Sequence, residues 1–168
     1  MRKAILLSAF IFSSMLYADE TSFAGKWFVS ESKDKLTDNV TVNAWITNKD
    51  AYIKGRLARD ISISARCSNN KTEAFVSFED IVSHDGTQVA YRLDDGEVVR
   101  EKWSRAEGGQ GLFSPNSIKF LKNLKEHRKL TFGFTPYASE MVAIDFDISG
   151  VDEMIKHISD ACNWKVYR

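Results

Sequence analysis

The sequence contains two cysteines, and the hydrophobic patterns around them constrain the fold more than any other feature. Apolar and polar residues alternate over 61–67, which predicts a strand with Cys67 on its apolar face. Apolar residues recur at helical spacing over 151–162, which predicts a helix with Cys162 on its apolar stripe. Both thiols are therefore expected to face one core, where a bond between them would attach the last helix to the sheet.

The N-terminal residues 1–18 have the pattern of a secretory signal peptide. A basic start is followed by an apolar run that ends at Leu16, and Ala18 precedes an acidic pair. The apolar run is shorter than the roughly 20 residues of a transmembrane helix. We expect export to the periplasm, cleavage after Ala18 and no transmembrane segment in the mature chain. The alternative is an uncleaved N-terminal anchor, because Leu16 is larger than the small residue usually preferred at its position.

If the chain is exported, its two cysteines are expected to form a disulfide. In an oxidising compartment Cys67 and Cys162 are the only pair available. A bridge that closes a loop of about 100 residues stabilises a domain by roughly 4–5 kcal/mol in the chain-entropy model. The alternative, a catalytic or redox-active thiol, lacks both a CxxC spacing and a nearby histidine. We therefore predict a structural disulfide.

The charge balance excludes one class of partner. The chain has 23 basic and 23 acidic side chains, and residues 1–18 include two of the basic ones and no acidic one. The mature chain, residues 19–168, then has a net charge of about −2 and the length of a single domain. Such a chain has no long-range field that would gather nucleic acid, so no nucleic-acid partner is expected.

The hydrophobic patterns predict strands first and helices late. Alternation predicts strands over 40–46, 74–78, 88–93, 97–103, 130–135 and 142–148 and a flexible loop over 108–111. Hairpins are expected at the turn over 68–71 after Cys67 and at Asp94-Asp95-Gly96, where a two- or three-residue loop leaves the pairing partners open. Ser117 is expected to cap a helix over 117–128, and the second helix carries Cys162. We predict an α+β fold: a mostly antiparallel β-sheet or sandwich with two short helices and one disulfide.

Several short motifs occur in a fixed order along the chain. They include Arg66-Cys67, Tyr91-Arg92 with Asp94-Asp95-Gly96, Trp103-Ser104, Pro136-Tyr137 and Ala161-Cys162-Asn163-Trp164. Over nearly all of residues 25–164 this order resembles the type VI secretion-associated periplasmic proteins of the VasI/TagO type. The resemblance implies a disulfide between Cys67 and Cys162 and a periplasmic, noncatalytic accessory role.

Enzymatic chemistry finds little support in the sequence. The three histidines, His84, His127 and His157, share no metal-ligand spacing. Asp145 and Asp147 fall on one face of a predicted strand, as a general acid/base pair would. The outward polar face of a half-buried strand explains them more simply. We expect no catalytic site, no metal and no cofactor.

Binding residues are predicted on two elements. On the first helix Lys119, Lys122 and Lys125 are three apart, which predicts either a solvated helix face or a contact for an anionic envelope partner. They are followed by Arg128 and Lys129, with only Glu126 opposing them.

The hairpin over 89–103 is the second candidate surface. Its candidate residues are Tyr91, Arg92, Asp94, Asp95 and Trp103. For Arg92 the alternative is a structural ion pair with Asp94 or Glu101, and for Trp103, as for Tyr137 and Trp164, it is packing in or over the core.

Two functions fit these observations. The first is an exported, noncatalytic interaction protein of a bacterial envelope machine, associated with type VI secretion and bound to one or more envelope proteins. The alternative is an envelope or prophage-encoded inhibitor or modifier that acts on peptidoglycan-active enzymes.

Overall fold

The computed structural model describes residues 20–53, 56–57, 60–82 and 87–166. The predicted signal peptide, residues 1–18, and His84 lie outside the described residues. The strands are β1 (Glu20–Ala24), β2 (Trp27–Lys33), β3 (Val40–Asn48), β4 (Tyr52–Ile53), β5 (Arg56–Leu57), β6 (Ile61–Ser68), β7 (Lys71–Ser77), β8 (Thr87–Leu93), β9 (Val99–Arg105), β10 (Gly111–Phe113), β11 (Lys129–Phe134) and β12 (Val142–Asp147). The helices are α1 (Ser117–Leu124) and α2 (Val151–Ala161).

Ten of these strands form one antiparallel sheet in the order β1-β2-β3-β6-β7-β10-β9-β8-β11-β12, and β4 pairs with β5 separately. The predicted α+β fold, with a mostly antiparallel sheet, two short helices and one disulfide, is confirmed. Within the described ranges, no helix is long and apolar enough to cross a membrane.

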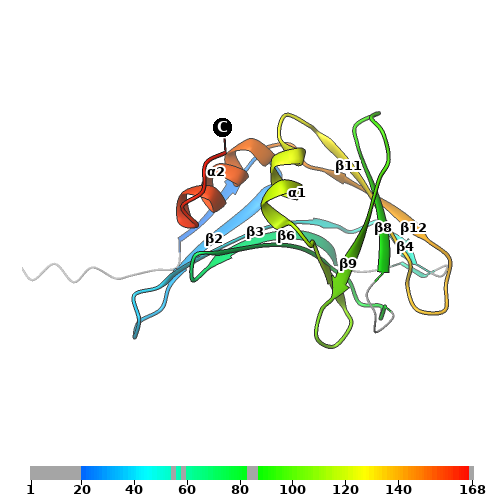
Figure 1. Ribbon diagram of the computed structural model, residues 1–168, viewed down its shortest axis with the longest axis horizontal. Coiled ribbons are helices and arrows are strands. Elements are labelled where there is room, and N and C mark those ends of the chain that lie inside the picture. Colours follow the sequence, from blue (N-terminus) through cyan, green and yellow to red (C-terminus); the bar gives the residue numbers. More distant parts are fainter. Residues whose placement is uncertain (1–19, 54–55, 58–59, 83–86, 167–168) are drawn as a thin grey trace, which may run out of the picture.

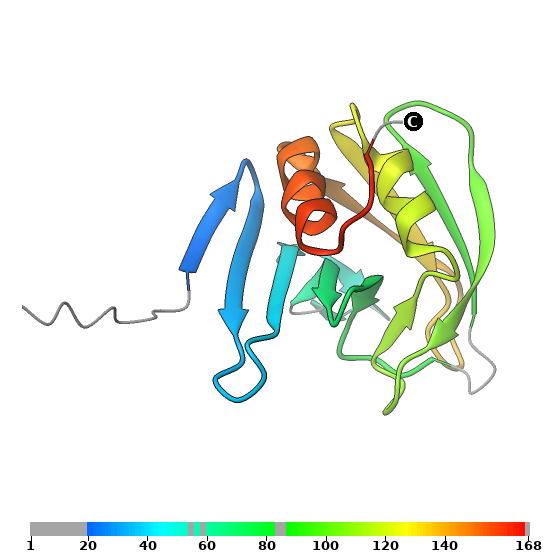
Figure 2. The same ribbon diagram turned by 60° about the vertical axis from the view of Figure 1, so that its left-hand side comes forward.

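The sheet curls around the two helices (Figure 1). Its last strand, β12, reaches back to β3, where the Asn48 side-chain amide donates to the carbonyl of Asp145 at 2.7 Å. The strands β1 and β2 extend beyond this contact and lie beside α2 (Figure 2). The concave side of the sheet is therefore covered by α1 and α2, and the first hairpin lies outside the curl.

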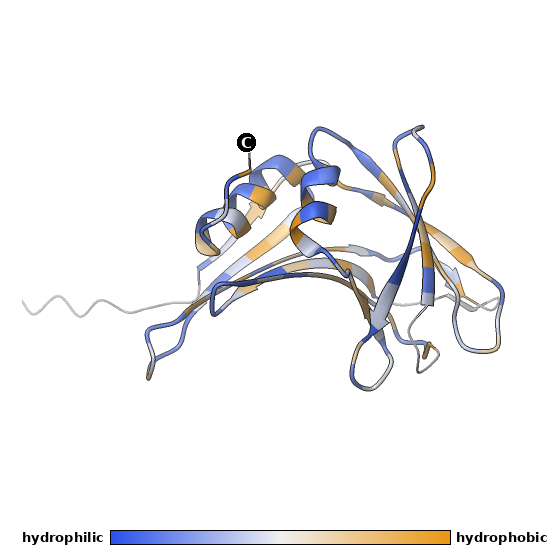
Figure 3. Ribbon diagram, viewed as in Figure 1, coloured by the Kyte–Doolittle hydropathy of each residue, from blue (hydrophilic) through white to orange (hydrophobic). Residues whose placement is uncertain are grey.

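The core lies between the helices and the sheet (Figure 3). Alternate residues of β6 are buried, including Ile61, Ile63 and Cys67, as the sequence predicts. The helices contribute buried apolar side chains such as Leu121 and Ile158. Burying one Leu or Ile side chain stabilises the fold by about 1.5–3 kcal/mol, so packing between the two layers is the main stabilising contribution.

Two glycines allow the first hairpin to meet the last helix. Gly25 in the β1–β2 turn and Gly150 before α2 both have positive φ, at 59° and 93°. A Cβ on Gly25 would lie 2.7 Å from the Cα of Gly150, and a Cβ on Gly150 would lie 2.6 Å from the Cα of Gly25. The backbones therefore touch, and the Trp27 indole N–H donates to the carbonyl of Ile148 at 3.2 Å.

The predicted start of the first helix is confirmed, whereas its predicted cap and its predicted end are wrong. It begins one residue after Asn116, whose side chain accepts the backbone N–H of Lys119 at 3.1 Å, while the Ser117 hydroxyl accepts from Ala74 N–H at 2.9 Å. It ends at Leu124 and not at 128. The chain turns there because Glu126 adopts a φ of 68° and its N–H donates to the Asp152 carboxylate at 3.2 Å.

Both predicted hairpins are confirmed, but the loop of the second is longer than expected. The β6–β7 turn is tight: Asn69 and Asn70 both have positive φ, as a two-residue turn requires. The hairpin predicted at Asp94-Asp95-Gly96 also forms, because β8 pairs with β9, but its loop is longer than two or three residues: residues 94–98 connect the strands and Tyr91 pairs with Val99. Asp94, and not Gly96, adopts the positive φ, at 46°.

Candidate interaction surfaces

Two residues proposed for a binding surface on the β8–β9 hairpin lie in the core. Tyr91 and Trp103 are 1% and 0% exposed. Both rings make edge-to-face contacts with Phe120 of α1, at centroid distances of 5.3 and 5.1 Å. Burial raises the pKa of the Tyr91 phenol. The folded domain therefore cannot present either ring to a partner, and the prediction for these two residues is corrected.

Asp94 has a structural role at the end of the same hairpin. Its carboxylate lies 2.7 Å from the imidazole Nδ1 of His127 and accepts the backbone N–H groups of Arg128 and Lys129 at 3.1 and 2.9 Å. These bonds, above all the one with His127, lower the pKa of the carboxyl group. Asp94 therefore fastens the β8–β9 turn to the chain that enters β11.

Asp95 and Arg92 remain available near this turn. Asp95 is exposed, and Arg92 is half-buried on β8 opposite Thr131. The ion pairs considered for Arg92, with Asp94 or with Glu101, are both absent from the part of the chain that the structure describes. Its positive charge contributes to a lowered pKa of Asp145.

The carboxylates on β12 face outward, as the simpler interpretation predicts. The Lys129 ammonium lies 2.7 Å from the Asp145 carboxylate, and the Thr131 hydroxyl donates to it at 2.6 Å. The hydroxyl of Ser149 donates to the Asp147 carboxylate at 2.5 Å, and the N–H of the same residue donates to it at 3.0 Å. These contacts lower the pKa of both carboxyl groups, so neither suits a proton donor at neutral pH.

The structure describes two of the three histidines. His127 is engaged with Asp94, and His157 is exposed on α2. Among the described residues, no three His, Cys, Asp or Glu side chains are grouped so that they could hold a metal ion.

The predicted lysine patch is less uniform than its spacing indicates. Lys119 is exposed, whereas the Lys122 ammonium lies 5.7 Å from the centroid of the Trp164 ring. Lys125 follows the end of α1 and pairs with Glu126 at 2.6 Å. Only Lys119 and Lys122 of the three therefore belong to the helix itself.

The disulfide fixes the segment that carries Trp164. Cys67 and Cys162 are bonded, with their Cα atoms 5.6 Å apart, as predicted. Beyond the bridge, the Asn163 side-chain amide donates to that of Asn70 at 3.3 Å, and the Trp164 indole N–H donates to the Thr72 hydroxyl at 2.8 Å. Residues 162–164 are therefore held across the β6–β7 hairpin.

A hollow of about 460 Å³ lies beside this segment, and we call it the C-terminal groove. It is lined by Lys125, Asp152, Lys156, Ser159, Asp160, Trp164, Lys165 and Val166. The Lys156 ammonium pairs with Asp160 at 3.1 Å, so the groove itself is nearly balanced in charge. The Lys122 ammonium over the Trp164 ring adds positive charge, and Lys119 lies one turn earlier on the same face of α1. Trp164 supplies an aromatic wall.

Sequence reasoning found only part of this groove. The charged residues of α2 that line it were missed, although their regular spacing of four on the solvent face of a predicted helix could have indicated them. The contact between Trp164 and Thr72 joins residues 92 positions apart, and no local signal predicts it.

Two further hollows flank β12. One of about 440 Å³ reaches Lys26 and Asn48, and one of about 420 Å³ reaches Arg128 and Ser149. Both have the outward carboxylates of β12 among their linings. Neither includes an aromatic ring that stands out from the sheet.

Comparison with known proteins gives a family match and a structural similarity. The family model described as "Type VI secretion system VasI, EvfG, VC_A0118" matches residues 16–164. Among solved structures, the crystal structure of invasion associated protein b from Bartonella henselae is similar, with a TM-score of 0.55 and 11% identity. The alignment covers 84% of this chain and 95% of that chain, and at this identity it concerns the fold alone. No curated protein matches the sequence.

Proposed function

The chain belongs to the VasI family of type VI secretion proteins, and from this membership we propose that it is an exported, noncatalytic accessory protein of the secretion apparatus. In this role it binds a protein of the bacterial envelope through the C-terminal groove. Of the three described hollows, the groove alone is lined by a half-buried tryptophan, Trp164, and the Lys122 ammonium lies over that ring.

The disulfide supports the exported part of the proposal. Cytosolic thiols are kept reduced, whereas the periplasm allows disulfides to form and persist. The bond between Cys67 and Cys162 lies in the core, where both side chains are at most 5% exposed. A chain that relies on such a bond folds best in an oxidising compartment, in agreement with the signal-peptide pattern of residues 1–18.

The lowered pKa values of three carboxyl groups support the noncatalytic part of the proposal. Asp94, Asp145 and Asp147 each accept hydrogen bonds that lower their pKa. A general acid requires a raised pKa near the working pH. These groups are instead committed to turns and strand pairs, where they stabilise the fold.

The rigid placement of Trp164 is the observation that carries the binding proposal. Tryptophan is enriched among residues that dominate the energy of protein interfaces. Trp164 is half-buried, hydrogen-bonded to Thr72 and two residues from the disulfide, so little side-chain freedom remains to be lost on binding. With Lys122 over the Trp164 ring and Lys119 one turn earlier on α1, the groove suits a partner that presents apolar and acidic side chains.

A secretion assay tests this function. In a bacterium whose type VI system includes this protein, the native gene is replaced by Lys119→Glu and, as a matched control, by Lys35→Glu. Both lysines are exposed, so both variants should fold as the wild type does. We expect Lys119→Glu to weaken partner binding by roughly tenfold and to reduce release of the secreted tube protein, while Lys35→Glu has no effect.

Equal secretion by both variants would count against the C-terminal groove, and normal secretion after deletion of the gene would count against the accessory role. The purified protein is also added to a lysozyme-type enzyme acting on peptidoglycan. Inhibition there would favour the alternative function of an inhibitor of peptidoglycan-active enzymes.

A further inference from the structure

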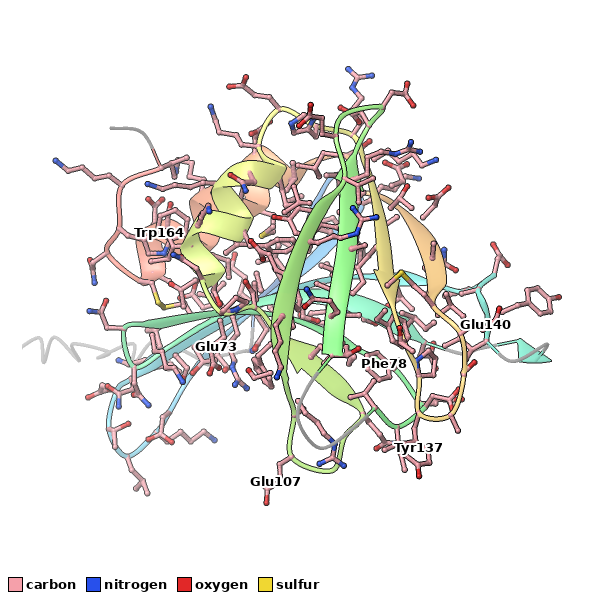
Figure 4. All side chains as sticks on the ribbon, turned by 45° about the vertical axis from the view of Figure 1, so that its right-hand side comes forward. Glu73, Phe78, Glu107, Tyr137, Glu140 and Trp164 are labelled. Atoms are coloured by element: carbon pink, nitrogen blue, oxygen red, sulfur yellow. A yellow bond between two sulfur atoms is a disulfide. The ribbon has the colours of Figure 1, made fainter. Side chains whose placement is uncertain are left out.

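Three loops lie side by side on the side of the molecule away from Trp164, and we call them the loop platform (Figure 4). The platform consists of residues 78–82, 105–111 and 135–141. The N–H of Tyr137 donates to the carbonyl of Ile81 at 2.7 Å, which joins the first loop to the third. The N–H of Val82 donates to the carbonyl of Gly109 at 3.1 Å, which joins the first loop to the second.

The platform is supported from the core. The rings of Phe78 and Phe134 stack with centroids 4.3 Å apart, and they are 4% and 0% exposed. The Arg105 Nε donates to the carbonyl of Val82 at 3.1 Å. The three loops therefore form one continuous surface whose shape is set before any partner arrives.

Large apolar side chains project from this surface into solvent. Ile81, Tyr137 and Met141 are 51%, 66% and 50% exposed. Exposed apolar groups that are grouped and rimmed by polar residues mark interaction sites, and tyrosine and methionine are enriched in the cores of protein interfaces. The platform has the composition of such a core.

The charged groups around these side chains are predominantly acidic. Glu79, Glu107 and Glu140 are exposed, and no ion pair with any of them occurs within the described part of the chain. Arg105 is the sole cation of the described loop residues, and its guanidinium lies against the backbone of Gly109. Figure 4 shows Glu107, Tyr137 and Glu140 toward the same side of the molecule.

We infer that the loop platform is a second protein-binding surface, whose partner presents a segment with lysine or arginine side chains between apolar ones. The apolar side chains of the partner segment cover Tyr137 and Ile81, and its lysine or arginine side chains pair with the surrounding carboxylates. An anionic lipid surface does not fit, since the carboxylates would repel it. This inference goes beyond the proposed function, because the platform and the C-terminal groove lie apart and select partners of opposite charge, so that one domain can connect two proteins.

A peptide titration tests the inference on the purified, disulfide-bonded domain. The probe is a soluble peptide of lysine, leucine and glycine, and the matched control peptide has glutamate in place of lysine. We expect NMR shift changes in residues 79–82, 107–110 and 137–141 with the lysine peptide, and much weaker ones with the glutamate peptide. Raising the salt concentration should weaken the binding, because exposed charges are screened.

Two variants separate a specific site from general attraction. Tyr137→Ala and Glu140→Lys change exposed side chains, so the melting temperature should be preserved, and each should weaken peptide binding by about tenfold. The control, Glu97→Lys, makes the same charge change in the β8–β9 turn and should leave binding unchanged. Equal effects of Glu97→Lys and Glu140→Lys would overturn the inference, as would shift changes centred on the C-terminal groove.

A second experiment uses the full protein in the cell. A photoreactive amino acid at position 137 is crosslinked in the native envelope, and the attached segment is sequenced. A segment that alternates basic and apolar residues supports the inference, whereas an acidic segment or a lipid overturns it. The peptide titration needs no secretion readout, so it can succeed or fail independently of the proposed accessory role.

Discussion

Asp94 and His127 are joined side chain to side chain, with 2.7 Å between a carboxylate oxygen and Nδ1, although 33 positions separate them in the sequence. The contact fastens the β8–β9 turn to the chain entering β11, and two backbone N–H groups strengthen it. The pKa of Asp94 is lowered as a result.

The contribution of Asp94 to stability should depend on pH. Because its folded pKa lies below the unfolded value near 3.9, the contribution is complete above that value and is lost as the pH falls through the folded pKa. We expect Asp94→Asn to lower the melting temperature at pH 7, and the difference from wild type to shrink below about pH 4. Thermal unfolding at several pH values measures this, with Asp95→Asn as control. A difference that stays constant down to the lowest pH would contradict the assignment.

Gly25 should be intolerant of any side chain. Gly25→Ala imposes a positive φ on alanine and drives its Cβ into the backbone of Ser149 and Gly150. We expect a loss of about 2 kcal/mol or more in the free energy of unfolding, measured with urea. Gly108→Ala is the matched control, because Gly108 also has positive φ but no atom lies within 4 Å of the Cβ site. Similar losses at the two positions would show that the backbone contact is unimportant.

Removal of the disulfide should be the most damaging of these changes. The bond closes a separation of 95 residues, so Cys162→Ser should reduce the free energy of unfolding by about 4 kcal/mol. Cys67→Ser should have the same effect, and a reducing agent should bring the wild type to the level of the variants. If the reduced wild type were as stable in urea as the oxidised form, the stabilising role of the bond would be disproved.

The hydrogen bond between Trp164 and Thr72 should couple the C-terminal segment to β7. Trp164→Phe keeps a ring beneath Lys122 but removes the indole donor, and Thr72→Val removes the acceptor. Each change should cost about 1 kcal/mol, and the double variant should cost less than the sum. Urea unfolding of the four proteins measures the coupling. Strict additivity would mean that the bond does not contribute.

The sequence predicted those helices and strands whose hydrophobic pattern lies within the element itself. The alternation in β3 and β6 and the helical stripe of α2 are sufficient by themselves, because one face of each must be buried. β1 was not predicted, since nearly all its residues are exposed and its pairing with β2 makes it a strand. β10 begins at Gly111, in the predicted loop, because β7 and β9 both pair with it.

The candidate surfaces were harder to predict. The sequence left the pairing across the β8–β9 hairpin open and carried no information on which face α1 covers, so the burial of Tyr91 against α1 could not be predicted. The C-terminal groove and the loop platform depend on contacts such as those of Trp164 with Thr72 and of Tyr137 with Ile81, which join distant parts of the chain. Composition alone cannot indicate such pairs.

The contact between the β1–β2 hairpin and α2 also has a consequence for folding kinetics. The bond from Trp27 to Ile148 spans 121 positions, and the loop-closure entropy of such a span must be offset before the contact is stable. Because a chain is synthesised from its N-terminus, β1 and β2 exist long before the helix that covers them. We expect the docking of this hairpin to be a late and slow step, during which its open edge is exposed to other chains. The speed of that last step, more than the final stability, then determines how much of the protein escapes aggregation.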